Sequence, residues 1–223
     1  MPNWHLGFAL ARLPARVPFT LLMLAALGVR AWRTDSDAAD LPQRVLQRVG
    51  FAPRDLLSFS WRRLISSALF THGRTEFWVA VVMVVAAVGL LEWSGGSIVA
   101  AVTFWGVHLA TLLAESLVIA LPLKLAGAEF GARLSDVRDV GPSAGYVGAL
   151  GLVCALLPRP WRDAAAAVVF AGLVYVVFAP DEQAVTDAAR LSADIAHFIA
   201  FPLGWYSLAL WRRLRTEHVG RAA

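Results

Sequence analysis

Two side chains in apolar surroundings carry the chemistry of a hydrolase, Ser143 and His197. A serine hydroxyl is a weak nucleophile until a base accepts its proton, and histidine is the commonest base near neutral pH. Ser143 lies in the segment GPSAG (141–145), at the expected start of an apolar helix, where exposed first-turn amides would stabilise an oxyanion. The pattern predicts Ser143 as nucleophile and His197 as general base, with Gly141 beside the oxyanion.

Two neighbouring polar or reactive groups complete this inspection. Asp194 lies about one turn before His197, where it would either orient the imidazole or face water at the helix entrance, and both roles stay open. The single cysteine, Cys154, lies inside an apolar run and is expected to be a small core residue. One cysteine allows no disulfide framework, and no zinc motif is present, so no metal or cofactor is implied.

The elements that must position these residues are apolar and long. The chain has 223 residues, of which 58% are hydrophobic, above the roughly 45–50% of soluble domains. Backbone polar groups inside lipid must be satisfied within the segment, which favours helices. We therefore expect a single all-α membrane domain over 1–223, with an interfacial loop of short helices at 33–75 and a basic tail at 212–223. The six expected spans are 17–32, 77–91, 98–121, 141–157, 165–179 and 191–211.

The charges fit a membrane protein better than a nucleic-acid-binding protein. The formal net charge is +4, but the cations are nearly all arginines scattered through loops and chain ends, with no basic helix. Arginines in such places are typical of contact with lipid headgroups. Their distribution predicts a multi-pass protein of the cell membrane with a cytoplasmic N-terminus, and the Ala- and Arg-rich, Lys-poor composition points to a bacterial source.

Six spans would bring the two catalytic candidates to the same side of the membrane. The fourth and sixth spans run in the same direction, although His197 lies about six residues deeper than Ser143. That offset closes if the fourth span begins below the surface, under the polar segment 131–140. Small residues would allow a close approach of the two helices. These small residues are Gly141, Gly145 and Ala149, with Gly148 and Gly151 beside them, and Ala196, Ala200 and Gly204.

Other interpretations of the polar residues were weighed. GPSAG also fits the nucleophile elbow of soluble hydrolases, but that elbow needs a preceding strand and its surroundings here are too apolar. His108 and Glu115 are seven residues apart on one helix face and would suit the proton path of a transporter. Without broken helices or an inverted repeat, we expect instead that His108 bonds a neighbouring helix and that Glu115 lies near the outer interface.

Four motifs in order resemble the rhomboid family of intramembrane serine proteases. Gly141, Ser143, Gly148 and Gly151 are similar to its Gly-x-Ser-Gly helix, and His197 with Gly204 to its sixth span. The first loop is similar through its tryptophan–arginine pair and the following Phe-x-His, and the end of the second span through its Gly, Glu and Gly. These further positions are Trp61, Arg62, Phe70, His72, Gly89, Glu92, Gly95 and Gly96.

The resemblance implies a six-transmembrane rhomboid-like bundle that cleaves membrane-spanning substrates with Ser143 and His197. Its partners would be a membrane-protein substrate or client and the lipid bilayer, with no nucleic acid. Two departures matter: Ala144 stands where the family has glycine, and the family's span-two histidine and asparagine fall at 76–77 and 80–81, where neither is present. The alternative is therefore a catalytically inactive rhomboid-like protein that binds or chaperones membrane partners.

Overall fold

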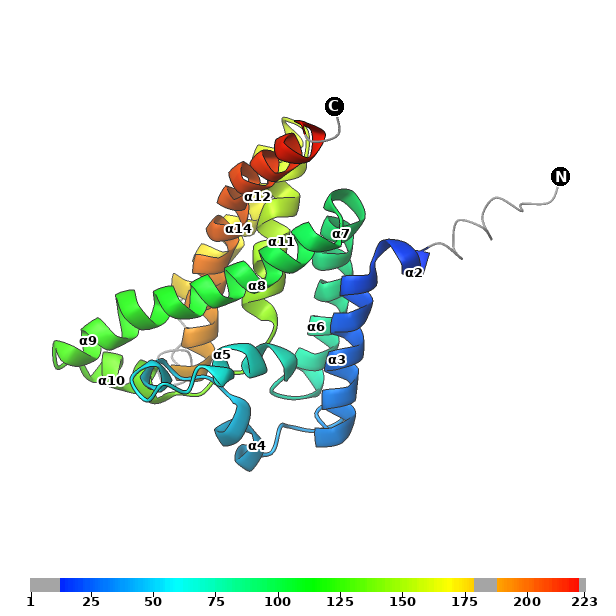
Figure 1. Ribbon diagram of the computed structural model, residues 1–223. Helices are drawn as coiled ribbons and strands as arrows, with labels where there is room; N and C mark the ends of the chain where they lie inside the picture. Colours follow the sequence, from blue (N-terminus) through cyan, green and yellow to red (C-terminus); the bar gives the residue numbers. More distant parts are fainter. Residues whose placement is uncertain (1–12, 179–187, 221–223) are drawn as a thin grey trace.

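The computed structural model describes residues 13–178 and 188–220, and these residues fold almost entirely into helices (Figure 1). Within them the only extended pairing is an isolated antiparallel bridge between Phe51 and Asp139. The expected all-α class is therefore confirmed. Ala179 and residues 221–223, which the expected fifth span and basic tail include, lie outside the described residues.

Each of the six expected apolar segments forms a helix. After the short α2 (Leu13–Arg16), α3 covers the first segment, and the second and third each contain a π-helical turn that continues the helix. The bounds are α3 Pro18–Thr34; α6 Arg74–Met83, η3 Val84–Gly89 and α7 Leu90–Gly95; α8 Ser97–Ala114, η4 Glu115–Ala120 and α9 Leu121–Leu125; α11 Ser143–Leu156; α12 Trp161–Phe178; and α14 Ala188–Gly220.

Short helices fill the connections, as expected for the segment 33–75. That segment contains α4 (Gln43–Val49), η1 (Pro53–Leu56), α5 (Arg62–Ser66) and η2 (Ser67–Leu69). The expectation for 131–140 was only partly right, because α10 (Glu129–Asp136) makes most of this polar segment helical and leaves 137–142 as the irregular part. The helix forms because its apolar residues fall on one side, with Leu134 fully buried under the rest of the molecule.

The number of helices fit to cross a bilayer is smaller than six. Among the described residues, three are long and apolar enough: Arg74–Gly95, Ser97–Leu125 and Trp161–Phe178. Helix α11 is apolar but shorter, and α3 has 17 residues. Helix α14 has the length, but its polar residues, His197 among them, reduce its hydropathy. It also continues to Gly220, so most of the segment expected as a basic tail is helical.

The loops and short helices gather at one end of the bundle (Figure 1). Helices α4, α5 and α10 lie there, together with the C-terminal end of α3 and the starting ends of α6, α11 and α14. The opposite end holds the turn after α7 and the C-terminal part of α14, since Trp211 Nε1 lies about 3.0 Å from the Cβ position of Gly95. Helices α11 and α14 thus run in the same direction, as expected.

The core lies between α3, the α6–α7 helix, α8, α11 and α14. Its largest fully buried side chains include Phe104, Leu27, Leu91 and Leu152, one from each of four helices. Helix α3 buries a single stripe of residues spaced three or four apart, which is the pattern of a helix packed on one side. Helix α11 instead buries residues all around its circumference and is the central helix.

A buried carboxylate joins the first helix to the end of the α6–α7 helix. Glu92 accepts hydrogen bonds from the backbone N–H groups of Phe19 and Thr20 at 2.8 and 2.7 Å, and from the Thr20 hydroxyl at 2.7 Å. First-turn amides have no carbonyl partner within their own helix, and a negative charge is favourable there. Glu92 therefore caps α3 from a different helix, which gives this motif residue a structural role.

Candidate functional site

The chain turns sharply before the helix that carries Ser143. Gly141 adopts φ of 153°, a conformation that favours glycine, and its N–H donates to the Ser67 carbonyl at 2.9 Å. Pro142 follows, and Ser143 is the first residue of α11. The first hydrogen bond of the helix runs from Tyr146 N–H to the Pro142 carbonyl at 3.1 Å. The amides of residues 143–145 precede that bond and have no carbonyl within the helix to bond.

Glycines bring α11 against its neighbours at van der Waals limits. A Cβ on Gly204 of α14 would overlap the backbone carbonyl of Gly148, so the two backbones are in direct contact. A Cβ on Gly151 would meet the backbone of α14 as well, at Phe201 and Trp205, whereas one on Gly145 would strike the Phe104 ring of α8 at 2.5–2.7 Å. The close approach was expected, but it uses Gly148 and Gly151 towards α14, while Gly145 faces α8.

Ser143 and His197 line the same cavity. It has a volume of about 270 Å³ and lies at the end of the bundle where the loops gather. Its walls come from the start of α6 and the loop before it, the segment leading into α11, and the second and third turns of α14. Besides Ser143 and His197, the residues that supply polar groups or close the wall are Thr71, His72, Thr75, Glu76, Asp139, Gly141 and Tyr146. The structure thus brings together Ser143, His197, His72 and Gly141.

The imidazole of His197 is held ready rather than bonded. Its Nε2 atom is buried and accepts or donates no hydrogen bond among the described residues, so it is not bonded to the Ser143 hydroxyl. A buried polar atom without a partner is costly and typically marks a site that binds something. Nucleophile and base are often further apart in a free enzyme than in the complex with substrate. The arrangement suits a base that engages Ser143 when substrate fills the cavity.

Asp194 does not bond His197. It is partly buried three residues before His197, and its charge interacts with Arg190, one turn earlier on α14. Of the two roles left open for Asp194, the contacts favour the helix entrance over orientation of the imidazole. The residues of α14 that line the cavity are Ala193 and His197.

Several residues of the cavity were not identified from the sequence as parts of the site. His72 was expected only to order the first loop; its Nε2 lies 2.7 Å from Asp139 Oδ1, and both line the cavity with Ser143. The same carboxylate oxygen accepts the N–H of Val140 at 2.8 Å. Asp139 thereby ties the segment before Ser143 to the loop before α6. Its position four residues ahead of the nucleophile was the one signal in the sequence.

A second, much smaller cavity lies on the other side of Ser143. It has a volume of about 20 Å³, room for about one water molecule, and is lined by His108, Glu115, Ser192 and Ser143 among others. His108 Nε2 lies 2.9 Å from the Leu64 carbonyl, as expected for a bond to a neighbouring element. Glu115 was expected near the interface and is instead fully buried, accepting a bond from Ser192 at 2.5 Å. The π turn η4 begins at Glu115.

The remaining motif residues lie away from the cavity. Trp61 and Arg62 are exposed on the first loop, and the Trp61 ring is tilted against Phe59 at 6.3 Å between centroids. Glu92 is at the opposite end of the bundle, and Gly148 and Gly204 meet at the helix crossing. These five residues therefore shape or hold the bundle, whereas the cavity is the site itself.

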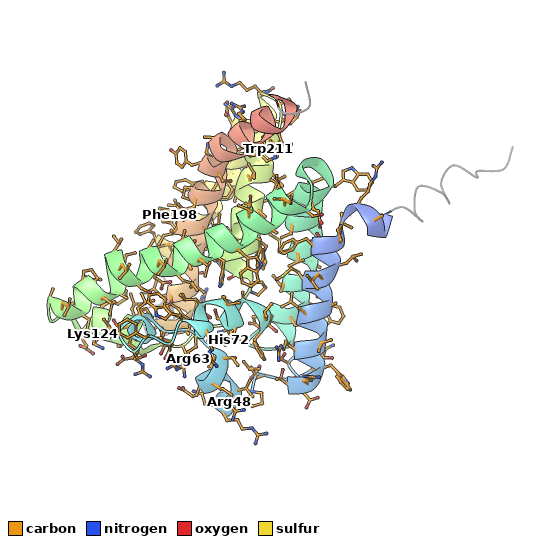
Figure 2. The ribbon with its side chains drawn as sticks, in the orientation of Figure 1. Arg48, Arg63, His72, Lys124, Phe198 and Trp211 are labelled. Atoms are coloured by element: carbon orange, nitrogen blue, oxygen red, sulfur yellow. The ribbon has the colours of Figure 1, made fainter. Side chains whose placement is uncertain are left out.

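An ion cluster around Asp55 fixes the loop that leads to Ser143. The carboxylate accepts bonds from Arg138 at 2.6 and 3.0 Å, from Arg63 at 3.0 Å and from the Ala52 N–H at 3.0 Å. Burial alone would raise the pKa of Asp55, but these bonds and the Arg138 charge outweigh it and hold the pKa below its ordinary value of 3.8. Figure 2 shows Arg63 and His72 at the loop end and Trp211 at the far end.

Comparisons with known proteins identify no relative: no family model, curated protein or solved structure matches this chain. Among the described residues, no group of three or more His, Cys, Asp or Glu side chains is arranged to hold a metal ion. What the site can do chemically is therefore argued from Ser143, His197 and their shared cavity.

Proposed function

We propose that this protein is an intramembrane serine endopeptidase in which Ser143 is the nucleophile and His197 the general base. The observation that carries the proposal is the shared cavity of about 270 Å³, with the serine on one wall and a buried, unbonded imidazole nitrogen on another. Buried ionisable groups in membrane helices are expensive and mark functional sites by default.

The reaction uses only groups of this chain and water. Ser143 Oγ attacks the scissile carbonyl carbon while its proton moves to His197 Nε2, and the first-turn amides of α11 receive the oxyanion. Collapse of the tetrahedral intermediate breaks the C–N bond, and the leaving amine takes the proton from His197. A water molecule, deprotonated by His197, then hydrolyses the serine ester and restores the free enzyme.

The proposed setting is a six-span rhomboid-like bundle in a cell membrane, with the N-terminus in the cytoplasm. Three apolar helices of full length, a shorter apolar central helix and six helices at the expected positions support it. A substrate helix must unwind before its carbonyl can be attacked, so glycine, serine or proline is expected near the cleavage point. The substrate would be a membrane-spanning protein whose unwound segment enters the cavity.

The second candidate is a non-catalytic rhomboid-like protein that binds or guides membrane partners. One observation favours it: the wall contributed by α6 presents Thr75, Glu76, Val79 and Ala80, none of which supplies the histidine and asparagine that the resemblance requires there. Loss of one oxyanion donor typically lowers a rate by about 10²–10³. The cavity would then serve as a docking site for an unwound segment of a client.

Cleavage of a model transmembrane substrate distinguishes the two functions. The purified protein is reconstituted with labelled single-span substrates that carry Gly, Ser or Pro near the membrane surface. A protease produces discrete fragments that disappear in Ser143→Ala and His197→Ala, while Ser94→Ala, at the far end of the bundle, cleaves normally. Co-purification of intact substrate with wild type and Ser143→Ala alike, without fragments, would establish the binding protein instead.

A further inference from the structure

A second cavity, unrelated to Ser143, lies between the C-terminal end of α3 and the short helix α4. Its volume is about 460 Å³, and it opens at the loop end of the bundle. Its lining is dominated by guanidinium groups and contains no carboxylate. The lining residues used below are Arg30, Arg33, Arg44, Arg48, Thr34 and Phe70.

The four arginines converge from two helices by their spacing. Arg30 and Arg33 are three apart on α3, and Arg44 and Arg48 are four apart on α4, so each pair shares one helix face. Within the described part of the chain, none of the four forms an ion pair with a carboxylate, although Asp35, Asp37 and Asp40 follow directly after α3. Four like charges around one hollow repel one another unless an anion joins them.

One contact fixes part of this arrangement. The Arg30 guanidinium lies over the Phe70 ring at 5.4 Å from its centroid, which holds the planar group in place at the cavity wall. A planar guanidinium presents two parallel N–H groups to an oxyanion, and its match to phosphate is especially good. The cavity therefore has the charge, the donors and the partial preorganisation of an anion site.

We propose that this cavity binds a phosphate group, carried by an anionic lipid or by a soluble phosphate. The position favours the lipid. Trp32, one turn from the end of α3, is 75% exposed, and exposed tryptophans at helix ends are typical of headgroup depth. Basic pockets beside membrane helices at that depth bind anionic headgroups. Figure 2 shows Arg48 on α4 at the same end of the molecule as His72.

The test is native mass spectrometry of the full-length protein in a neutral detergent, titrated separately with phosphatidylglycerol, phosphatidylcholine and inorganic phosphate. Two double variants remove half of the charges each, Arg30→Gln with Arg33→Gln and Arg44→Gln with Arg48→Gln. The control is Arg133→Gln with Arg159→Gln, which removes the same charge from exposed positions with ion pairs at 3.9 and 3.8 Å. Melting temperatures verify that every variant is folded.

We expect wild type and control to bind phosphatidylglycerol in preference to phosphatidylcholine, and each cavity variant to bind it about tenfold or more weakly. Saturation by inorganic phosphate with the same losses, but no preference for phosphatidylglycerol, would assign the site to a soluble phosphate. Equal binding of both anions by cavity variants and control would overturn the proposal, as would the absence of any saturable binding in wild type.

Discussion

Helices α11 and α12 follow one another in the chain and are both apolar, yet they occupy opposite environments. Most residues of α11 are buried, and its glycines touch the backbone of α14 and the side chains of α8. Helix α12 has no buried residue, and a Cβ on its Gly172 would meet nothing within 4 Å. Composition alone does not distinguish the two, because both are rich in alanine and valine.

The difference explains why the candidate nucleophile lies on the shorter helix. With 14 residues, α11 is roughly 21 Å long at 1.5 Å per residue, less than the roughly 30 Å of a hydrocarbon core. A helix enclosed by protein need not match lipid thickness, so its first turn can open into a polar cavity below the surface. Helix α12, with 18 residues and an outer face of apolar side chains, has the length for contact with lipid.

The largest effect is expected at the crossing of α11 and α14. Gly204→Ala places a methyl group where the Gly148 backbone carbonyl already lies, and a backbone cannot rotate away as a side chain does. We expect the free energy of unfolding to fall by about 3 kcal/mol or more, the upper range for overpacking. Reversible unfolding in mixed detergent micelles measures this change.

The matched control is Gly172→Ala on α12. Its methyl group enters open space, so we expect no loss and a gain of up to about 1 kcal/mol from the better helix propensity of alanine. Equal destabilisation by both substitutions would contradict the contrast between the two helices.

An intermediate effect is expected from the cap on α3. Glu92→Ala leaves the N–H groups of Phe19 and Thr20 without their acceptor in a buried place, which costs about 2 kcal/mol. Glu92→Gln keeps one acceptor oxygen and loses less. Glu129→Ala, whose carboxylate is exposed and 3.9 Å from Arg133, is expected to change the unfolding midpoint little. A midpoint for Glu92→Ala equal to that of Glu129→Ala would remove the cap from the account.

The smallest effect is expected from acid acting on Asp55. The pKa of this carboxyl is lower in the folded chain than its ordinary value of 3.8, so the unfolded state binds the proton more readily. The stabilisation is complete above that ordinary value and is lost as pH falls through the folded pKa. Unfolding midpoints measured from pH 6 to pH 3 are expected to fall most steeply at the acid end, and Asp55→Asn is expected to flatten that slope. An unchanged slope in Asp55→Asn would show that other carboxyls cause it.

Much of the helical layout could be predicted because apolar runs and glycine turns are local properties of the sequence. Ser143 at a helix start and His197 on a parallel helix follow from such patterns. The burial of Glu115 could not be predicted, because its partner Ser192 is 77 residues away and only packing brings them together. The helical continuation of α14 past Trp211 was missed because arginines there indicate a membrane boundary without indicating the end of a helix.

The central claim is that His197 activates Ser143 as a nucleophile. Labelling by a fluorophosphonate probe, with the modified residue located by mass spectrometry, tests it most directly. We predict a single adduct on Ser143 in wild type and a labelling rate reduced about 10²-fold or more in folded His197→Ala. No adduct on Ser143, or equal labelling rates in wild type and His197→Ala, would contradict the claim.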